Sequence, residues 1–150
     1  MQNNMKDFFI ELDDLPDEIL LHIFRKLDNV EALFYLIDVN QRFNRILHDP
    51  IFTSHLCLLE YYPERNCISR LGDLVLDRFC STILPQIGHQ VKILLLEETS
   101  IDRVVRASNY SNLTDLGLYN IQVEVAESLF DGKTFSLIGF IREVIDYLQT

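Results

Sequence analysis

Apolar side chains in the first third of the chain recur with the spacing of an α-helix. Between residues 15 and 27 they fall at i, i+1, i+4, i+5 and i+8, as Ile19, Leu20, Ile23, Phe24 and Leu27. This spacing predicts a helix with a broad apolar face. Leu15 and Pro16 open the helix, because proline is well tolerated at the first helical position. The face is broader than a single packing partner would bury.

Two shorter helices are expected directly after the first. Asp28 or Asn29 caps the second helix, and Asp38 caps the third. Pro50 ends the third helix, because proline disfavours helical geometry in the residue before it. The apolar positions of the second helix are Leu33, Leu36 and Ile37, and those of the third are Val39, Phe43, Ile46 and Leu47.

A connector with helical character is expected over residues 57–90. Pro85 kinks or ends its helix, since a proline within a helix costs about 3 kcal/mol, and Gly88 then allows the chain to turn. The helix is expected to cap the region that follows. Its apolar positions with helical spacing are Leu71, Leu74, Val75, Phe79, Ile83 and Ile87.

From Val91 onward the apolar pattern repeats every 22 residues. Each unit is expected to form one short strand and one helix or turn, whose apolar sides are buried only when units stack. Two later columns, which begin at Ile101 and Val104, keep the same register. The hexads are Val91-x-x-Leu94-x-Leu96, Leu113-x-x-Leu116-x-Leu118 and Phe135-x-x-Ile138-x-Phe140, and the columns continue through Val123 and Ile145 and through Ala126 and Leu148.

The net charge of −10 narrows the range of partners. Because no basic face is available to neutralise phosphates, nucleic acid and anionic membrane surfaces are disfavoured. Residues 1–7 lack the apolar segment of a signal peptide, and the longest apolar run is far too short for a membrane span. We therefore expect a cytoplasmic or nuclear protein with no membrane partner.

Candidate chemical groups form no catalytic or metal-binding pattern. Cys57, Cys67 and Cys80 have neither zinc nor redox spacing, and no two histidines share a metal-ligand spacing. The five glycines form no phosphate-binding loop. We expect three reduced thiols, no cofactor, no metal and no enzyme activity, although a Cys/His pair that meets only in space stays open.

The N-terminal helices resemble an F-box. The resemblance is ordered and gap-free over about 40 residues, and an unrelated amphipathic three-helix bundle is the alternative. Phe43 and Phe52 stand where many F-boxes carry tryptophan, so both positions keep a large aromatic side chain. The matching residues are Leu15-Pro16-x-Glu18-Ile19-Leu20-x-x-Ile23-Phe24-x-x-Leu27, then Leu33, Val39, Arg42-Phe43 and Asp49-Pro50-x-Phe52.

The F-box resemblance implies docking on the Skp adaptor, which bridges to the cullin scaffold of a ubiquitin ligase. A module this small leaves much apolar surface exposed, and exposed apolar patches usually mark protein interfaces. Val39, Phe43 and Ile46 are expected to lean toward the core. Carried over by position, the resemblance implicates Leu15, Pro16, Glu18, Ile19, Ile23, Phe24 and Leu27 in adaptor binding, with Leu33, Val39 and Phe43 as supports.

The 22-residue units resemble leucine-rich repeats. Thr99, Ile121 and Glu143 stand where that family usually has asparagine or cysteine, so the side-chain hydrogen bonds to the loop are expected to be absent. The alternatives are a small α/β domain with evenly spaced strands, and a terminal helix in place of the third unit. We expect a naturally short member or the N-terminal part of a longer product. Partner contacts would come from exposed strand positions such as Lys92, Glu97, Thr114, Asp115 and Tyr119.

These patterns predict a mainly α fold with short parallel strands. The expected parts are a flexible tail at 1–11, an F-box-like module at 12–56, a helical connector and cap at 57–90, and leucine-rich-repeat-like units at 91–150. We expect a substrate-recognition subunit of an SCF-type cullin ubiquitin ligase, which binds the Skp adaptor through the F-box and a substrate protein through the repeats. The alternative is a protein-interaction scaffold that uses the same helices outside any ligase.

Overall fold

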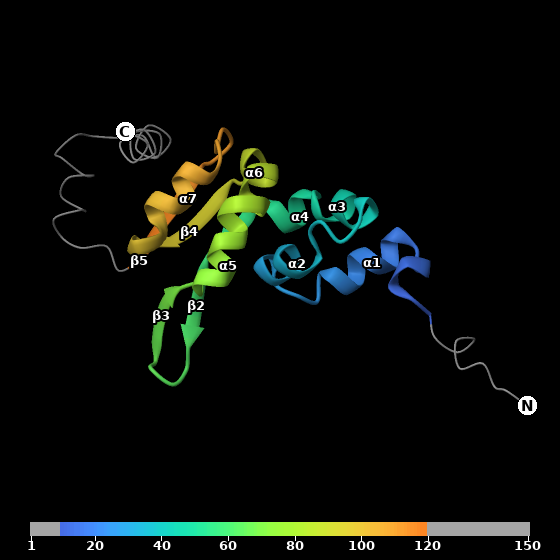
Figure 1. Ribbon diagram of the computed structural model, residues 1–150, viewed down its shortest axis with the longest axis horizontal. Helices are drawn as coiled ribbons and strands as arrows, with labels where there is room; N and C mark the ends of the chain where they lie inside the picture. Colours follow the sequence, from blue (N-terminus) through green and yellow to red (C-terminus); the bar gives the residue numbers. More distant parts are fainter. Residues whose placement is uncertain (1–9, 120–150) are drawn as a thin grey trace, which may run out of the picture.

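Helices make up the N-terminal third of the described chain, and strands enter only after residue 54 (Figure 1). The computed structural model describes residues 10–119. Most of the predicted tail therefore lies outside the described residues. So do the repeat unit that begins at Phe135 and the later columns of the second unit, at Val123 and Ala126.

Three helices form an N-terminal bundle, as the apolar spacing predicts. Asp28 caps the second of them by accepting a hydrogen bond from Glu31 N at 2.8 Å, which satisfies a donor that the helix itself leaves unpaired. Pro50 follows the end of the third helix and opens a further single turn. The three helices are α1 (Asp17–Phe24), α2 (Asn29–Leu36) and α3 (Gln41–Leu47); the short α4 (Pro50–Thr53) follows them, and a 3-10 turn (Leu12–Asp14) precedes them.

Two helix starts differ from the predicted ones. Pro16 is the residue before α1 rather than its first residue. Asn40 caps α3 in place of Asp38, because its side chain accepts a hydrogen bond from Phe43 N at 2.7 Å. Asp38 has a φ of 63°, so the chain reverses there and leaves Val39 outside the helix, 56% exposed. The prediction that Val39 belongs to the third helix and leans toward the core is wrong.

Strands replace the helical structure expected at the start of the connector. β1 (His55–Cys57) crosses the boundary predicted between residues 56 and 57. An antiparallel hairpin of β2 (Leu59–Tyr62) and β3 (Cys67–Arg70) follows and projects from the rest of the molecule (Figure 1). Asn66 has a φ of 47° and supplies the left-handed residue that the turn uses. This part of the connector is therefore β-structure, contrary to the prediction.

The second half of the connector is a continuous helical stretch, as predicted. Pro85 lies in its last segment and does not end it, because a wider π-helical turn comes directly before and rearranges the hydrogen bonds there. Of the apolar positions predicted here, Leu74 points to solvent and is 85% exposed. The segments are α5 (Asp73–Arg78), the π-helical stretch (Phe79–Ile83) and α6 (Leu84–Ile87).

A parallel three-stranded sheet joins the bundle to the repeat-like region. Its strand order is β1–β4–β5, and its last strands are connected by a helix. The new elements are β4 (Ile93–Glu97), α7 (Ile101–Ala107) and β5 (Asp115–Tyr119). Leu94 pairs with Leu116 and Leu96 pairs with Leu118. The sequence offset of 22 residues is therefore also the register of the sheet.

The same backbone contact precedes β4 and β5. The carbonyl oxygen of Ser54 accepts hydrogen bonds from Lys92 N and Ile93 N, both at 2.9 Å. The carbonyl oxygen of Lys92 accepts in turn from Thr114 N at 2.8 Å and from Asp115 N at 3.0 Å. β1 is thus equivalent to the later strands, and the sheet begins before Val91, where the repeats were predicted to start.

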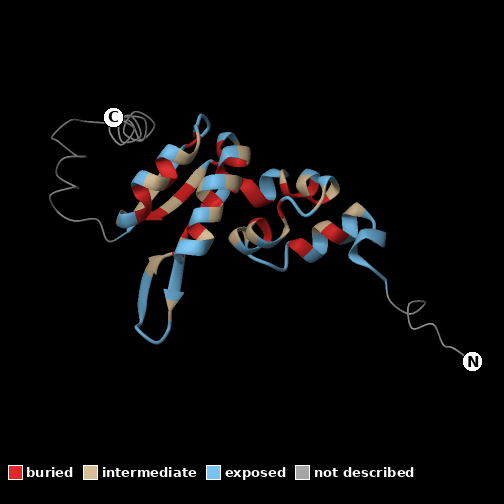
Figure 2. Cartoon of the chain, in the orientation of Figure 1, coloured by how far each residue is buried: buried red, intermediate tan, exposed pale blue. Residues whose placement is uncertain are grey.

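One apolar core runs from the bundle through the sheet (Figure 2). All five repeat positions of the first unit are buried, and in the second unit Leu113 is buried while Leu116 and Leu118 are half-buried. The structure confirms a helix-rich fold with a few short parallel strands after an N-terminal helical region. A leucine-rich-repeat solenoid remains a prediction.

Candidate functional site

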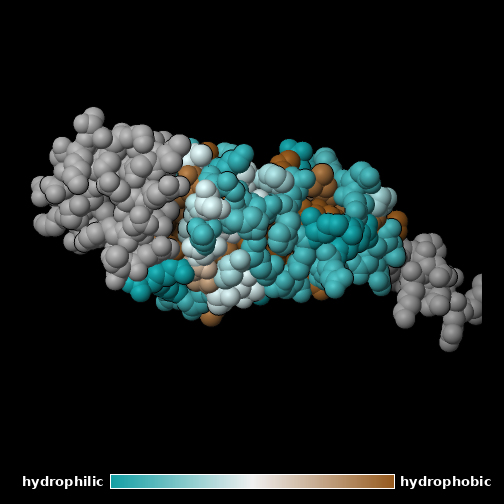
Figure 3. Space-filling model, turned by 90° about the horizontal axis from the view of Figure 1, so that it is seen from above, coloured by the Kyte–Doolittle hydropathy of each residue, from teal (hydrophilic) through white to brown (hydrophobic). Residues whose placement is uncertain are grey.

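The first helix carries two apolar stripes that face different directions. Leu20 and Phe24 are fully buried, whereas Ile19 and Ile23, one position earlier in each case, are 47% and 37% exposed. Ile19 and Ile23 lie one turn apart on the same side of the helix, and Pro16 before the helix and Leu27 after it are exposed as well. We call this surface the α1 outer stripe; it consists of Pro16, Ile19, Ile23 and Leu27. Figure 3 shows apolar patches in a mostly hydrophilic surface at this N-terminal end of the molecule.

The residues predicted to bind or support an adaptor fall into two groups, one buried and one exposed. Phe24, Leu33 and Phe43 are buried, and the rings of Phe24 and Phe43 meet edge to face with their centroids 5.1 Å apart. These three side chains hold the bundle together, and Leu15 is half-buried beside them. The exposed members are Pro16, Glu18, Ile19, Ile23, Leu27 and Val39.

A guanidinium group from α3 holds the start of α1 in place. Arg42 Nε donates to Asp17 Oδ1 at 2.7 Å, and the same side chain donates to the carbonyl oxygens of Asp13, at 2.7 Å, and Leu15. Arg45 Nη2 donates to the other carboxylate oxygen of Asp17 at 3.1 Å. The extended segment before α1 is therefore fixed against α3. The α1 outer stripe is presented in one orientation as a result.

The two arginines change the titration of the carboxyl group between them. The hydrogen bond from Arg42 is the main reason that the pKa of Asp17 lies below its ordinary value of 3.8, and Arg45 adds to the shift. Sequence reasoning noted Arg42 only as part of the F-box pattern and assigned Asp17 no contact. The only signal for the contact was opposite charge at two positions that are far apart in the chain.

Side-chain hydrogen bonds at both ends of α2 attach the bundle to the rest of the molecule. Arg78 donates to the carbonyl oxygens of Phe34 and Ile37 at 3.0 and 2.9 Å, at the end of α2 where carbonyls lack helical partners. At the other end of the same helix, Asn29 Nδ2 donates to the carbonyl oxygen of His55 at 3.1 Å. The bundle is thus attached to α5 and to β1 by polar contacts as well as by the shared core.

Alternate residues of the sheet form a second surface away from the buried leucines. Leu94 and Leu96 point into the core, so their neighbours along β4 point to the opposite side. Strand pairing places these neighbours in rows with residues of β1 and β5. We call this surface the outer sheet face; its rows are His55, Ile93 and Asp115, and Cys57, Leu95 and Gly117, and each of these residues is exposed or half-buried.

One of the strand positions expected to contact a partner is buried. Glu97 is only 7% exposed; its carboxylate accepts hydrogen bonds from Thr99 N, at 3.0 Å, and from the Thr99 hydroxyl group. Ser100 Oγ also donates to the carbonyl oxygen of Glu97 at 2.9 Å. The side-chain bonds to backbone in the loop after β4 thus come from Glu97 and Ser100, whereas the hydroxyl group of Thr99, at the position where leucine-rich repeats usually have asparagine or cysteine, bonds to a carboxylate. The other four positions, Lys92, Thr114, Asp115 and Tyr119, are exposed.

Within residues 10–119, no three His, Cys, Asp or Glu side chains lie together in a way that would hold a metal ion. No helix in the described range combines the length and the apolar character needed to cross a membrane. Cys57 and Cys67 are exposed, and Cys80 is partly buried. Burial raises the pKa of the Cys80 thiol, which makes it a poor nucleophile at neutral pH.

Comparison with known proteins identifies the bundle. The F-box-like family model matches residues 12–59, which covers α1 to α4, β1 and the first residue of β2. The comparisons with curated proteins and with solved structures found no match. The match includes the α1 outer stripe, the buried aromatic pair and the arginine contact to the start of α1. Residues 12–59 are therefore an F-box-like domain.

Proposed function

We propose that this chain is a substrate-recognition subunit of an SCF-type cullin ubiquitin ligase. The observation that carries the proposal is the α1 outer stripe within an F-box-like domain: an apolar surface that the chain's own core leaves exposed. Burial of such side chains against a partner is favourable, at roughly 25 cal/mol per Å² of apolar surface. The Skp-type adaptor is the partner that the F-box-like domain suggests, and the adaptor would connect the chain to a cullin.

The geometry of the domain favours tight docking. Arg42 fixes the segment that contains Leu15 and Pro16 before any partner arrives. Less ordering is then needed on binding, and preorganisation of this kind raises affinity. Glu18 and Val39 are exposed in the same domain and would contribute contacts beside the stripe, whereas Phe24, Leu33 and Phe43 act by supporting it.

The substrate protein would bind the outer sheet face. Exposed side chains at Lys92, Thr114, Asp115 and Tyr119 border the strands and offer charge and aromatic surface to a partner. Continuation of the 22-residue register beyond β5 would extend this face in the manner of leucine-rich repeats. In this proposal the chain holds two proteins near each other in the cytoplasm or nucleus and performs no bond chemistry itself.

The adaptor contact is tested with charged substitutions in the stripe. Ile19→Asp combined with Ile23→Asp places two carboxylates on an apolar interface, and we expect the affinity for a purified Skp-type adaptor to fall at least about tenfold. The matched control is Leu74→Asp, because Leu74 is equally apolar, is more exposed and lies on α5 outside the F-box-like domain. Circular dichroism of each variant checks that the fold is kept.

Two outcomes would decide against the proposal. If the wild-type chain does not bind the adaptor, or if the control loses as much affinity as the stripe variant, the assignment of the interface fails. The ligase role is tested separately by reconstitution with adaptor and cullin and by following ubiquitin transfer to a co-purified protein. Adaptor binding without cullin recruitment would favour the scaffold alternative.

A further inference from the structure

A groove of about 360 Å³ lies between the F-box-like domain and the hairpin. Residues from α2, β2 and α5 line it, so it is formed by parts of the chain far apart in sequence. Buried or half-buried apolar side chains of all three elements contribute to its lining. We call it the α2–hairpin groove and define it by Asp28, Glu31, Phe34, Tyr35, Glu60 and Tyr61, which carry its chemistry.

Exposed aromatic rings border this groove. Tyr35 is 64% exposed and Tyr61 is 56% exposed, and tyrosine is enriched at protein interfaces. The rings of Tyr35 and Phe34 meet edge to face with centroids 5.0 Å apart. The Tyr61 hydroxyl group is held by Asn66 at 2.8 Å. The aromatic surface is thus ordered by contacts within the chain and not by a partner.

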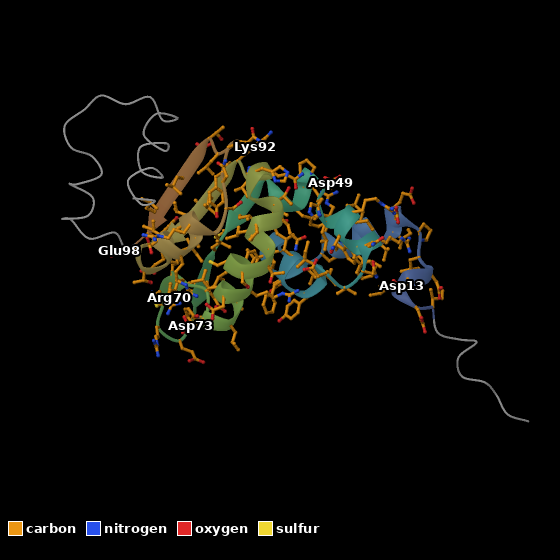
Figure 4. All side chains as sticks on the ribbon, turned by 45° about the horizontal axis from the view of Figure 1, so that its top comes forward. Asp13, Asp49, Arg70, Asp73, Lys92 and Glu98 are labelled. Carbon is orange, nitrogen blue, oxygen red and sulfur yellow. The ribbon has the colours of Figure 1, made fainter. Side chains whose placement is uncertain are left out.

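Three carboxylates surround the same groove. Asp28 accepts from Glu31 N as a helix cap, and Glu60 accepts from the Tyr62 hydroxyl group at 3.0 Å. No ion pair involves Asp28, Glu31 or Glu60 among residues 10–119, whereas Arg70 and Asp73 pair with each other nearby (Figure 4). Within that range, the residues that line the groove include no lysine, arginine or histidine. Carboxylates therefore outnumber cations among the lining residues, which favours a cationic occupant.

A ring that lines the groove already makes a cation–π contact within the chain. The guanidinium carbon of Arg78 lies 5.6 Å from the centroid of the Phe34 ring, in the geometry of a cation–π interaction. Arg78 itself does not line the groove. An arginine guanidinium is planar and weakly hydrated, so it stacks on rings and pairs with carboxylates at the same time.

We propose that the α2–hairpin groove binds an arginine-bearing peptide segment of another protein. The guanidinium group stacks against Tyr35 or Tyr61 and pairs with Glu31 and Glu60, and an apolar neighbour in the peptide covers the aliphatic lining. The groove shares no residue with the α1 outer stripe, and of the outer sheet face only Cys57 also lines it. Its occupation therefore does not depend on the adaptor.

The probe is the blocked hexapeptide with the sequence Gly-Leu-Arg-Leu-Arg-Gly, titrated into the full chain. Amide chemical shifts are followed by NMR, and the affinity is measured by calorimetry. We expect shifts on α2, β2 and α5 and an affinity that falls as the salt concentration rises. The peptide in which citrulline replaces both arginines keeps the shape and loses the charge, so we expect it to bind at least about tenfold more weakly.

The decisive variant is Glu31→Gln combined with Glu60→Gln. Its matched control is Glu64→Gln combined with Glu98→Gln, which removes the same net charge outside the groove. We expect the first variant to lose at least about tenfold in peptide affinity and to bind the adaptor as before, and the control to keep its peptide affinity.

Four results would overturn the inference. The first is a loss of peptide affinity in the control variant as large as that in Glu31→Gln/Glu60→Gln, and the second is equal affinity for the citrulline and arginine peptides. The third is that the amide chemical shifts change only on other surfaces. The fourth is sedimentation that shows self-association of the chain, with the peptide unable to bind the dimer. Equal loss would mean general attraction to an acidic protein, and equal citrulline binding would mean a purely apolar occupant. The proposed function is tested by the adaptor affinity of the stripe variant, and the groove is tested by peptide affinity. Failure of either proposal therefore leaves the other unaffected.

Discussion

Arg42 Nε donates a hydrogen bond to Asp17 Oδ1 at 2.7 Å, and this ion pair ties α3 to the first turn of α1. The same guanidinium group reaches the carbonyl oxygens of Asp13 and Leu15. One side chain thus organises the whole segment through which the F-box-like domain begins. The exposed stripe of α1 depends on an arginine that does not belong to it.

Arg42→Ala should weaken both folding and adaptor binding. Loss of the two hydrogen bonds to backbone carbonyl oxygens is expected to lower the free energy of unfolding by about 1–2 kcal/mol. Arg45→Ala is the matched control, because Arg45 pairs with the same carboxylate group of Asp17 and is mostly exposed, and exposed ion pairs contribute little. Urea denaturation measures the stability of each variant, and adaptor titration measures the interface. Equal effects of the two substitutions would contradict the role assigned to Arg42.

Stability should depend on pH through Asp17. Its pKa in the folded chain is below 3.8, mainly because of the hydrogen bond from Arg42, so the unfolded state binds a proton more readily. The stabilisation is fully present above pH 3.8 and is lost as the pH falls through the lower, folded pKa. Asp17→Asn should therefore cost stability at pH 6 and cost less at pH 3. Paired urea titrations at the two pH values measure the difference; a constant difference would exclude the linkage.

Gly88→Ala should destabilise the chain through a steric clash. A Cβ atom at this position would lie 2.0 Å from Ser108 Oγ and 2.5 Å from Ser108 Cβ, so the segment after α7 must move. We expect a loss of about 1–3 kcal/mol. Gly72→Ala is the control, since nothing lies within 4 Å of the added Cβ atom. Alanine is a poorer helix cap than glycine, but it also lowers the conformational entropy of the unfolded chain, and these two effects on stability oppose each other. Thermal unfolding of both variants gives the comparison.

Tyr110→Phe should remove a buried hydrogen bond. The hydroxyl group donates to the carbonyl oxygen of Val104 at 2.6 Å, near the end of α7, and its loss is expected to cost about 0.5–1.5 kcal/mol. Burial also raises the pKa of the Tyr110 phenol above its ordinary value of 10.0. The stabilisation that this buried, protonated phenol gives the folded chain is fully present below pH 10. It falls as the pH rises further, because the phenol ionises in the unfolded chain first.

Guanidinium chloride titrations at pH 8 and at pH 10.5 measure both effects of Tyr110→Phe. The wild-type chain should lose more stability between the two pH values than the variant does. A variant that loses as much as the wild type would show that other groups are responsible for the alkaline loss.

Periodicity predicted the elements whose stabilising contacts are local. The helices around Leu20, Leu33 and Ile46 follow from apolar spacing, because the apolar face of an amphipathic helix tends to be buried whatever it packs against. The sheet register followed for a related reason, since the 22-residue offset that aligns Leu94 with Leu116 in sequence also aligns them in space. Val39 was misplaced because Asp38 adopts a positive φ, a conformation that the apolar spacing does not reveal.

The elements that sequence reasoning missed depend on distant partners. β1 has only three residues, and its pairing with Ile93 joins segments that share no visible pattern. The hairpin of β2 and β3 lacks a clean alternation of apolar and polar residues, as its largely exposed strands show. The α2–hairpin groove was also out of reach, because its carboxylates and tyrosines come together only when α2, β2 and α5 are assembled.

A single residue, Ser54, separates α4 from β1, and its carbonyl oxygen is bonded to both Lys92 N and Ile93 N. The chain therefore passes from the helices of the F-box-like domain into the sheet without a flexible linker. In the proposed complex, a protein on α1 and a protein on the sheet would therefore be held at a fixed distance and angle. This geometry, and not diffusion at the end of a flexible linker, would then determine which surface groups of the second protein face the first.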